Sequence, residues 1–428
     1  MTRRTSCAIE KPNLTLGFIP LVDCAPLVVA QEHGWFRAQG LSVELSREAS
    51  WANVRDKVGA GLLDGAHMLA PMPLASALDP SQPALVTGLG LSLNGNAITV
   101  SAGLYRRMQE LDSESLQPYP IRARALRRVL DQDRAQGRPP RTLAHVFPAS
   151  SHHYLLRYWL AADGIDPDRD VRLVVVPPVQ MVTQLEQGRI DGYCVGAPWS
   201  EMAESLGIGR TVVTTGALWN NHPEKVFGVS RIWAERHPET HRAVLRALMQ
   251  ASRWLDRPEN LEETAELLAL SAYVHAPKRL LLQALGGGFG DRGHTAAPVF
   301  HRQAAGFPWH SQAAWFVSQM RRWGESGIQE NLSGLLARTY RTDLFRQAAA
   351  DVDIPCPTAD SRLEGSHGQA WTLTAASAPM GMGPDLFFDG QVLDMESVLV
   401  DANGNRPESA WHLRDFDGVQ SVPGAERS

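Results

Sequence analysis

Cysteine is scarce in this chain of 428 residues, which has only four. Cys7, Cys24, Cys194 and Cys356 are scattered, with no CxxC pair and no His/Cys cluster at metal-ligand spacing. The sequence therefore indicates neither a disulfide framework nor a zinc site. We expect no bound metal and no cofactor.

Long apolar runs and a surplus of basic residues are also absent. No window is apolar for long enough to cross a bilayer, and polar residues at 10–13 interrupt the basic start before any signal-peptide core. The net charge of -5 argues against nucleic acid or a membrane surface as the main partner. The stretch IRARALRR at 121–128 is typical of a solvated helix face. With Met1 as the true start, we expect a cytoplasmic protein.

The length and the periodicity of the chain predict two similar lobes. A chain of 428 residues is too long for one ordinary core. Short apolar runs alternate with amphipathic segments over 14–90 and again over 141–206, which predicts an α/β protein. We expect strands at 14–20, 41–47, 84–90, 141–148, 171–176 and 190–195, and helices at 26–36, 51–61, 151–162, 179–187 and 198–206. Further along we expect crossings between lobes at 91–103 and 215–228, helices within 231–284 packing on the first lobe, a loop at 285–310, a helix at 310–325, and a tail after about 355 that wraps or frays.

One phrase occurs twice, as GLLDGAHMLAP at 61–71 and GRIDGYCVGAP at 188–198. Five of its residues recur 127 positions later: Gly61, Asp64, Gly65, Ala70 and Pro71 correspond to Gly188, Asp191, Gly192, Ala197 and Pro198. The pattern predicts a helix that ends at glycine, a turn at the acid-glycine step, a buried strand, and a helix that begins near proline. We interpret His67, inside the first copy, as a core histidine.

Two lobes joined by crossing segments make a cleft, and clefts between lobes bind ligands. Helix starts after Ser50 and after Ser150 or Ser151, and at Pro71 and Pro198, are expected to face this cleft. Free N–H groups and the positive end of each helix dipole would favour a small anion there.

Five separated stretches and a tail phrase carry a resemblance to a known family. They are SREASWANVRDKVGAGLLDGAHMLAPMPL, LSLNGNAITVS, FPASSHHYLLRYWLAADGI, IDGYCVGAPWSEMAE, HPEKVFGVS and the tail FFDGQV. With them, residues 14 to about 390 resemble the nitrate-binding proteins of ABC transporters, and more closely their cytoplasmic branch, the NasS-type nitrate/nitrite sensors. The resemblance implies a two-lobe, type II periplasmic-binding-protein-like fold. We place one lobe at 14–97 plus 225–428 and the other at 98–224.

The resemblance also implies a set of ligand-binding residues. Carried onto this chain, they are Trp51, the backbone at Asn53, Asn96, His152 and Lys225, with Pro198 and Trp199 shaping the wall. The family has Gln where this chain has the shorter Asn96. Nitrate is a planar monoanion, so one lysine, a few N–H donors and an aromatic wall would complement it. From the residues alone, Trp51 could equally be core packing, His152 a surface residue and Lys225 an exposed lysine.

The resemblance finally implies a function: a cytoplasmic nitrate or nitrite sensor that holds an ANTAR-type RNA-binding antiterminator (NasT-like) and releases it when the anion binds. One alternative is the substrate-binding component of a nitrate or bicarbonate ABC transporter. The other is an enzyme on the same two-lobe fold. The enzyme is disfavoured because the chain has no GxSxG elbow, P-loop or zinc motif, and no acidic pair within the matched motifs.

Overall fold

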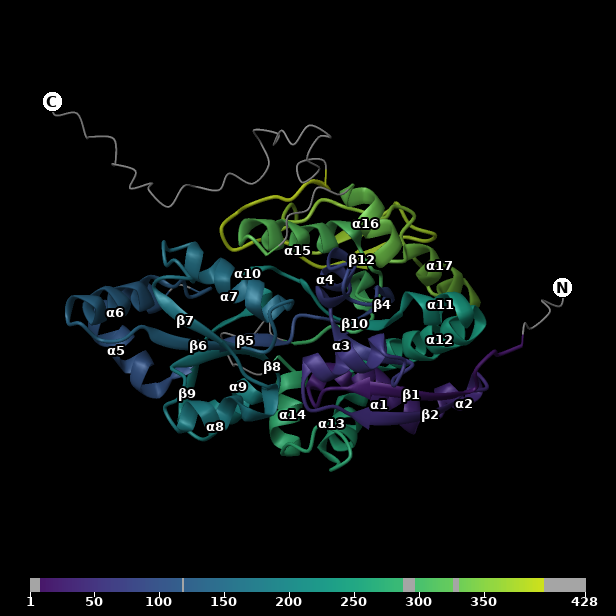
Figure 1. The fold of residues 1–428 in the computed structure, drawn as a ribbon, viewed down its shortest axis with the longest axis horizontal. Coiled ribbons are helices and arrows are strands. Elements are labelled where there is room, and N and C mark those ends of the chain that lie inside the picture. The colour runs from purple at the N-terminus through teal and green to yellow at the C-terminus, as the bar shows by residue number, and fades with distance from the viewer. Residues whose placement is uncertain (1–7, 118, 288–296, 326–330, 396–428) are drawn as a thin grey trace.

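Two five-stranded sheets organise the fold (Figure 1). The computed structural model describes residues 8–117, 119–287, 297–325 and 331–395. The first sheet has the order β2-β1-β3-β10-β4 and the second the order β7-β6-β8-β5-β9. In each sheet the first three strands are parallel and the fourth is antiparallel to both of its neighbours. The two lobes, each one sheet with its helices, therefore repeat one topology.

The first lobe takes its strands from both sides of the second in sequence. Its strands are β1 (Asn13–Phe18), β2 (Ser42–Arg47), β3 (Gly65–Leu69), β4 (Leu85–Leu93) and β10 (Pro223–Ser230). Its helices are α1 (Ala25–Glu32), α2 (Trp35–Ala38), α3 (Trp51–Gly59), α4 (Met72–Leu78), α11 (Arg231–Arg236), α12 (Pro238–Leu255), α13 (Leu261–Ala269) and α14 (Lys278–Leu285).

The second lobe is continuous in sequence. Its strands are β5 (Asn96–Ser101), β6 (Arg141–His145), β7 (Val171–Val175), β8 (Gly192–Gly196) and β9 (Gly209–Thr214). Its helices are α5 (Ala102–Asp112), α6 (Arg124–Ala135), α7 (Ser151–Ala161), α8 (Met181–Glu186), α9 (Trp199–Ser205) and α10 (Thr215–Leu218). The strands and helices that the periodicity predicts in both lobes are confirmed within a few residues, except that the predicted helix at 26–36 divides into α1 and α2.

The repeated phrase has the same structural role in both lobes. Asp64 N donates to Thr15 O at 2.9 Å, and the Asp64 carboxylate accepts from Thr15 N at 3.0 Å. Asp191 does the same with Thr142 (2.7 Å and 2.8 Å). Thr142 also lies 127 positions after Thr15, so the acid of each copy joins the start of one strand to the start of its parallel neighbour.

The chain crosses between the lobes within the two predicted segments, but each crossing occupies only a few residues. Residues 91–103 consist mostly of the end of β4 and of β5, and the crossing is the turn at Asn94 and Gly95, whose φ angles are 60° and 91°. The return, expected at 215–228, consists mostly of α10 and β10, which leaves only 219–222 between them. Each crossing leads into the fourth strand of a sheet, β5 or β10, which pairs on both sides, so the two lobes are joined by two short connections.

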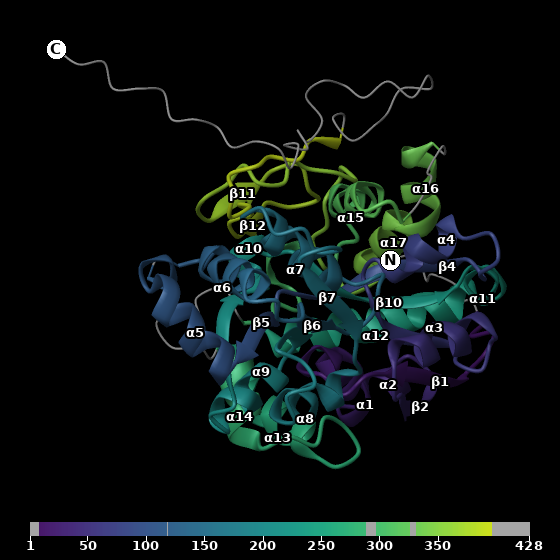
Figure 2. The ribbon, with the colours of Figure 1, turned by 60° about the vertical axis from the view of Figure 1, so that its left-hand side comes forward.

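The C-terminal part covers both lobes along one side (Figures 1 and 2). It contains α15 (His310–Arg322), α16 (Leu332–Thr339), α17 (Thr342–Asp351), β11 (Trp371–Leu373) and β12 (Met380–Met382). Phe387 stacks on Trp219 of the return segment with 4.9 Å between ring centroids, and Phe388 N donates to Leu218 O at 2.9 Å. Residues 356–395 thus wrap the molecule, and the predicted fraying of 396–428 lies outside the described residues. Of the predicted loop at 285–310, residues 288–296 also lie outside the described residues, and the rest is irregular apart from the end of α14, a short 3-10 turn at Arg302–Ala304 and the first residue of α15.

Candidate functional site

Three charged side chains meet at the junction of the lobes, all buried. They are Asp23, which precedes α1, and the neighbours Glu224 and Lys225 at the start of β10, with exposures of 3%, 0% and 0%. Lys225 Nζ donates to Asp23 Oδ2 at 2.7 Å and also to Glu224 Oε1. Burial lowers the pKa of Lys225, but the two carboxylates outweigh it and raise that pKa above its ordinary value. The lysine is therefore charged and already paired twice.

A bulge in β10 explains why two neighbouring side chains reach the same place. Successive side chains of a regular strand point to opposite faces. Here Pro223 pairs with Leu93 and Lys225 with Ser92, so Glu224 is an extra residue opposite the single step of β4. Such an insertion changes the directions in which the neighbouring side chains point. This local irregularity brings an acid and a base together in a strand that is otherwise buried and apolar.

Three buried histidines surround these charges. His67 Nε2 lies 2.9 Å from Asp23 Oδ1, while His67 Nδ1 accepts from Ile19 N at 3.4 Å. His152, the second residue of α7, places Nε2 at 3.4 Å from Glu224 Oε1. Burial lowers the pKa of His67, lowers that of His152 well below its ordinary value, and lowers that of His222 to about 4. All three rings are thus neutral at neutral pH, and the cluster carries one positive and two negative charges.

Both lobes contribute to this cluster, which we call the junction cluster: Asp23, Trp51, His67, Ser151, His152, His222, Glu224 and Lys225. Ser151 Oγ of the second lobe donates to Glu224 of the first. Beside it, Val22 N of the first lobe donates to Ala197 O of the second at 3.0 Å. Burial of these groups therefore depends on the two lobes being together.

Several buried polar atoms here have no hydrogen-bond partner within the protein. They are Trp51 Nε1, the side-chain oxygen and nitrogen of Asn96, both ring nitrogens of His152, and Trp199 Nε1. Trp51 places its ring centroid 5.5 Å from Lys225 Nζ and 5.4 Å from the ring of His67. Because buried polar groups are nearly always hydrogen-bonded, this set points to a small polar ligand with several acceptor atoms.

The structure brings together three of the residues that the sequence singles out, Trp51, His152 and Lys225. Trp51 and His152 begin helices whose first turns are capped by Ser50 and Ser150. Asn96 and Pro198 are buried and Trp199 is half-buried, on β5 and at the start of α9. Asn53 differs: its side chain is exposed and its backbone N–H donates to Ser50 Oγ at 3.2 Å, so that donor is already engaged.

Sequence reasoning missed both carboxylates and underrated His67. Asp23 lies outside the matched motifs, and Glu224, although inside the motif HPEKVFGVS, was assigned no role. A signal was present for Asp23, which interrupts the otherwise apolar stretch FIPLVDCAPLVVA. Charged residues in such stretches are rarely buried unless paired. His67 is in the core as interpreted, but there it contacts Asp23 and Trp51.

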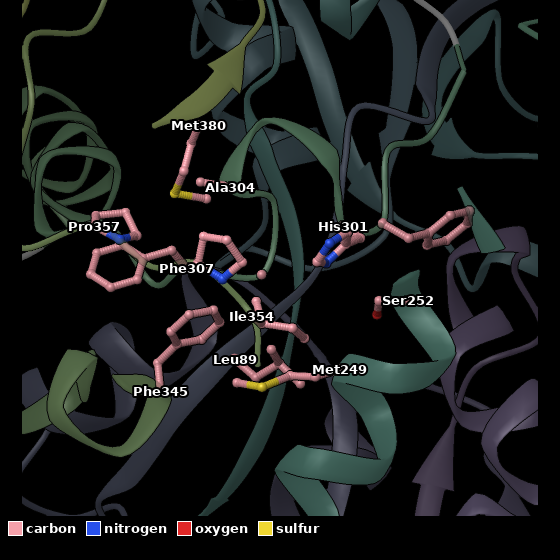
Figure 3. Close-up of a pocket in the computed structure, with 13 residues that line it drawn as sticks. Leu89, Met249, Ser252, His301, Ala304, Phe307, Phe345, Ile354, Pro357 and Met380 are labelled. Atoms are coloured by element: carbon pink, nitrogen blue, oxygen red, sulfur yellow. The ribbon is translucent and has the colours of Figure 1, made fainter. Parts of the chain in front are cut away.

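A small cavity elsewhere in the molecule is not the ligand site. It lies in the first lobe below the C-terminal wrap, has a volume of about 20 Å³, and is lined mainly by apolar side chains such as Met249, Phe307, Phe345 and Met380 (Figure 3). A space of this size holds about one water molecule. Over the described ranges, no group of three or more His, Cys, Asp or Glu is arranged to hold a metal ion. No helix in the same ranges has the length and apolar character needed to cross a membrane.

The chain has two α/β lobes with the same strand order, joined by two short connections, and a polar cluster where the lobes meet. This is the two-lobe periplasmic-binding-protein fold. The crystal structure of the periplasmic nitrate-binding protein NrtA from Synechocystis is similar to that of this chain, with a TM-score of 0.79. The two sequences are 29% identical, and the match covers 92% of this chain and 98% of that one. The chain belongs to the NMT1-like family, whose model matches residues 7–269.

Two relatives widen the comparison. The nitrate/nitrite binding protein NrtA of Synechococcus elongatus is 33% identical over 93% of this chain and 87% of its own length. The bicarbonate transport ATP-binding protein CmpC of Synechocystis is 40% identical over 80% of this chain and 51% of its own. This chain thus spans about half the length of the ATP-binding relatives that it matches.

Proposed function

We propose that this protein binds nitrate or nitrite at the junction cluster. The observation that carries the proposal is the set of unpartnered buried donors on Trp51, Asn96 and His152, contributed by both lobes around Lys225. A ligand that accepts from both lobes stabilises the state in which they are together. The two NrtA proteins, whose names assign them nitrate or nitrite, support this ligand class.

The chemistry of the cluster favours a small monoanion over sulfate or phosphate. Its cation is a lysine, a compact charge without the bidentate fork that suits tetrahedral oxyanions. The indole of Trp51 offers a flat face and one N–H, which fits a planar ion with weak acceptors. Bicarbonate is the second candidate, because it is also a planar monoanion and CmpC carries its name.

A calorimetric titration with nitrate, nitrite, bicarbonate, sulfate and chloride tests this proposal. We expect heat with nitrate or nitrite and none with sulfate or chloride. Trp51→Phe keeps the ring and removes the unpartnered N–H, so its affinity should fall roughly 5- to 10-fold, as for one lost hydrogen bond. The matched control is Trp371→Phe, in β11 of the C-terminal wrap, which should bind normally. Binding of bicarbonate alone would favour the second candidate, and no binding of any ion would refute the proposal.

We further propose that the bound anion is a signal. In this proposal the protein is cytoplasmic, holds an ANTAR-type RNA-binding antiterminator (NasT-like) when empty, and releases it when nitrate or nitrite binds. The resemblance of its motifs to NasS-type sensors supports this role. Release requires that the partner prefer the empty form and the anion the closed form. By reciprocity, the partner must weaken anion binding by the same factor, typically about 5- to 150-fold.

Gel filtration of the protein with such an antiterminator distinguishes the sensor from its alternatives. We expect one complex without anion and two separate proteins with nitrate or nitrite. A complex that never forms, or one that persists with saturating anion, would leave the substrate-binding component of a nitrate or bicarbonate transporter as the better candidate. Turnover of a substrate by the purified protein would instead support an enzyme on this fold.

A further inference from the structure

We infer that the anion enters the junction cluster together with one proton, which His152 holds between the anion and Glu224. The inference rests on the proposed anion binding and adds to it the charge state in which the site accepts its ligand. It follows from how the charges are already paired in the structure.

The cation of the site is fully used before any anion arrives. Lys225 Nζ contacts a carboxylate oxygen of both Asp23 and Glu224, and all three groups are buried. With neutral imidazoles the cluster has a net charge of −1, and a monoanion would bring it to −2. Two uncompensated charges away from water are strongly unfavourable. Uptake of one proton keeps the net charge at −1 while the anion is bound.

Among the histidines, His152 is the one whose ring is free to take this proton. His67 Nδ1 accepts from Ile19 N, so a proton placed on that nitrogen would cost this hydrogen bond, and His67 Nε2 lies 2.9 Å from Asp23 Oδ1. His222 contacts Thr215 Oγ1 at 2.7 Å and Pro223 O at 3.1 Å. His152 has no hydrogen bond at either nitrogen, and its Nε2 lies 3.4 Å from Glu224 Oε1. When protonated, its ring can donate to Glu224 on one side and to the anion on the other.

The charged and titratable groups around His152 give the direction of the effect. Burial and Lys225 lower the pKa of the empty-state ring, while Asp23 raises it. The groups facing it from the surrounding elements are Asp23, His145, His222, Glu224 and Lys225, with His153 on its own helix. Two further titratable groups adjoin this set: His67 contacts Asp23, and Cys194 lies near Glu224 and Lys225. A bound anion adds a negative charge at short range and raises the pKa of His152. The ring is then neutral without the anion and charged with it over the intervening pH range.

The sign of the pH dependence follows. Below the pKa of the empty state the ring is charged in both states, and affinity does not depend on pH. Above that pKa, each anion must bring a proton from solution, so affinity falls about tenfold per pH unit until the pKa of the bound state is passed. In that range, one proton is taken up per anion.

Titration calorimetry with nitrate and nitrite in two buffers of different ionisation enthalpy, such as phosphate and Tris at pH 7.5, measures this proton directly. The difference between the observed enthalpies gives the number of protons, which we expect to be close to one for wild-type protein. Binding without proton uptake would overturn the inference and leave the proposed function intact. Failure of both anions to bind would refute the proposed function, and the inference with it.

Two glutamine variants locate the proton. Glu224→Gln lowers the negative charge of the cluster by one, so proton uptake should fall toward zero and affinity at pH 8.5 should exceed that of wild type. Glu201→Gln is the matched control, because Glu201 is a second buried carboxyl whose pKa burial raises to about 7. It should keep one proton per anion. His152→Gln, tested in the same way, should also lose proton uptake. If Glu201→Gln loses proton uptake while Glu224→Gln keeps it, the proton is held elsewhere and the inference is overturned.

Discussion

Replacing Lys225 by methionine tests the electrostatics of the junction cluster without any ligand. The change keeps the length of the buried side chain but leaves the carboxylates of Asp23 and Glu224 buried without their cation. Breaking a buried ion pair from one side costs about 3–5 kcal/mol. Because ordinary domains unfold with a free energy of about 5–15 kcal/mol, the variant should be clearly destabilised at pH 7.5.

The loss should depend on pH in a defined direction. In the wild type, burial would raise the pKa of Asp23, but Lys225 and His67 outweigh it and hold the pKa well below its ordinary value of 3.8. That contribution to stability is present above the ordinary value and is lost as pH falls through the lowered one. Without the lysine, burial prevails and raises the pKa, so the variant loses stability as pH rises. The gap between the two proteins should be widest near pH 8 and narrow toward pH 5.

Urea denaturation followed by tryptophan fluorescence at several pH values measures this gap. Lys278→Met is the matched control, because Lys278 also lies between two glutamates, Glu262 and Glu266, but on the surface. It should change the denaturation midpoint little. Adding Glu224→Gln to Lys225→Met should recover part of the loss. A gap of the same size for Lys225→Met and Lys278→Met, or one that does not vary with pH, would refute this account of the cluster.

Three further predictions concern the scaffold. Phe387→Ala removes a buried ring stacked on Trp219 and should lower the free energy of unfolding, measured by urea denaturation, by about 3–5 kcal/mol. Leu386→Ala, which truncates the more exposed neighbouring side chain, should lower it far less. Asp64→Ala should destabilise more than Asp191→Ala, because Asp64 also accepts from a buried indole; equal midpoints would contradict this. Burial raises the pKa of Glu201 to about 7, so ionising this carboxyl disfavours the folded wild type. As pH rises from about 4.5 to about 7, the free energy of unfolding of Glu201→Gln should therefore rise by about 3 kcal/mol relative to that of the wild type. A difference between the two proteins that does not vary with pH would contradict this.

The sequence predicts the regular parts of the fold because burial has a period. Strands such as β1 and β6 and helices such as α3 and α7 are found where the apolar residues recur with a period of two or of 3.6. Crossing segments have no such period. The sequence places the first crossing within 91–103, but both flanking strands are buried and the actual turn is two residues long. Pairing between distant strands, which no local pattern records, decides where each one ends.

The same limit applies to the site. Family motifs predict Trp51, His152 and Lys225, and these three lie within the junction cluster. Glu224 belongs to the same motif as Lys225, but in a regular strand neighbouring side chains point to opposite faces, so the motif alone does not predict that both join the cluster. The bulge that turns Glu224 inward depends on how β10 pairs with β4, 130 residues earlier in the chain. Asp23 is 202 residues from Lys225, and only the folded chain shows that they are partners.

The repeated phrase separates scaffold from site within a single chain. Where the two copies agree, as at Asp64 and Asp191, the residues make the same hydrogen bonds to the start of a neighbouring strand. Where they differ, as at His67 and Cys194, both positions are fully buried on corresponding strands, yet only the histidine contacts a carboxylate of the cluster at hydrogen-bond distance. Burial and Glu224 raise the pKa of the Cys194 thiol well above its ordinary value, which keeps it neutral beside the same charges. The two copies therefore share the aspartate that joins neighbouring strands and differ at a buried position beside the cluster, where the first copy has a histidine that contacts Asp23 and the second has a neutral thiol.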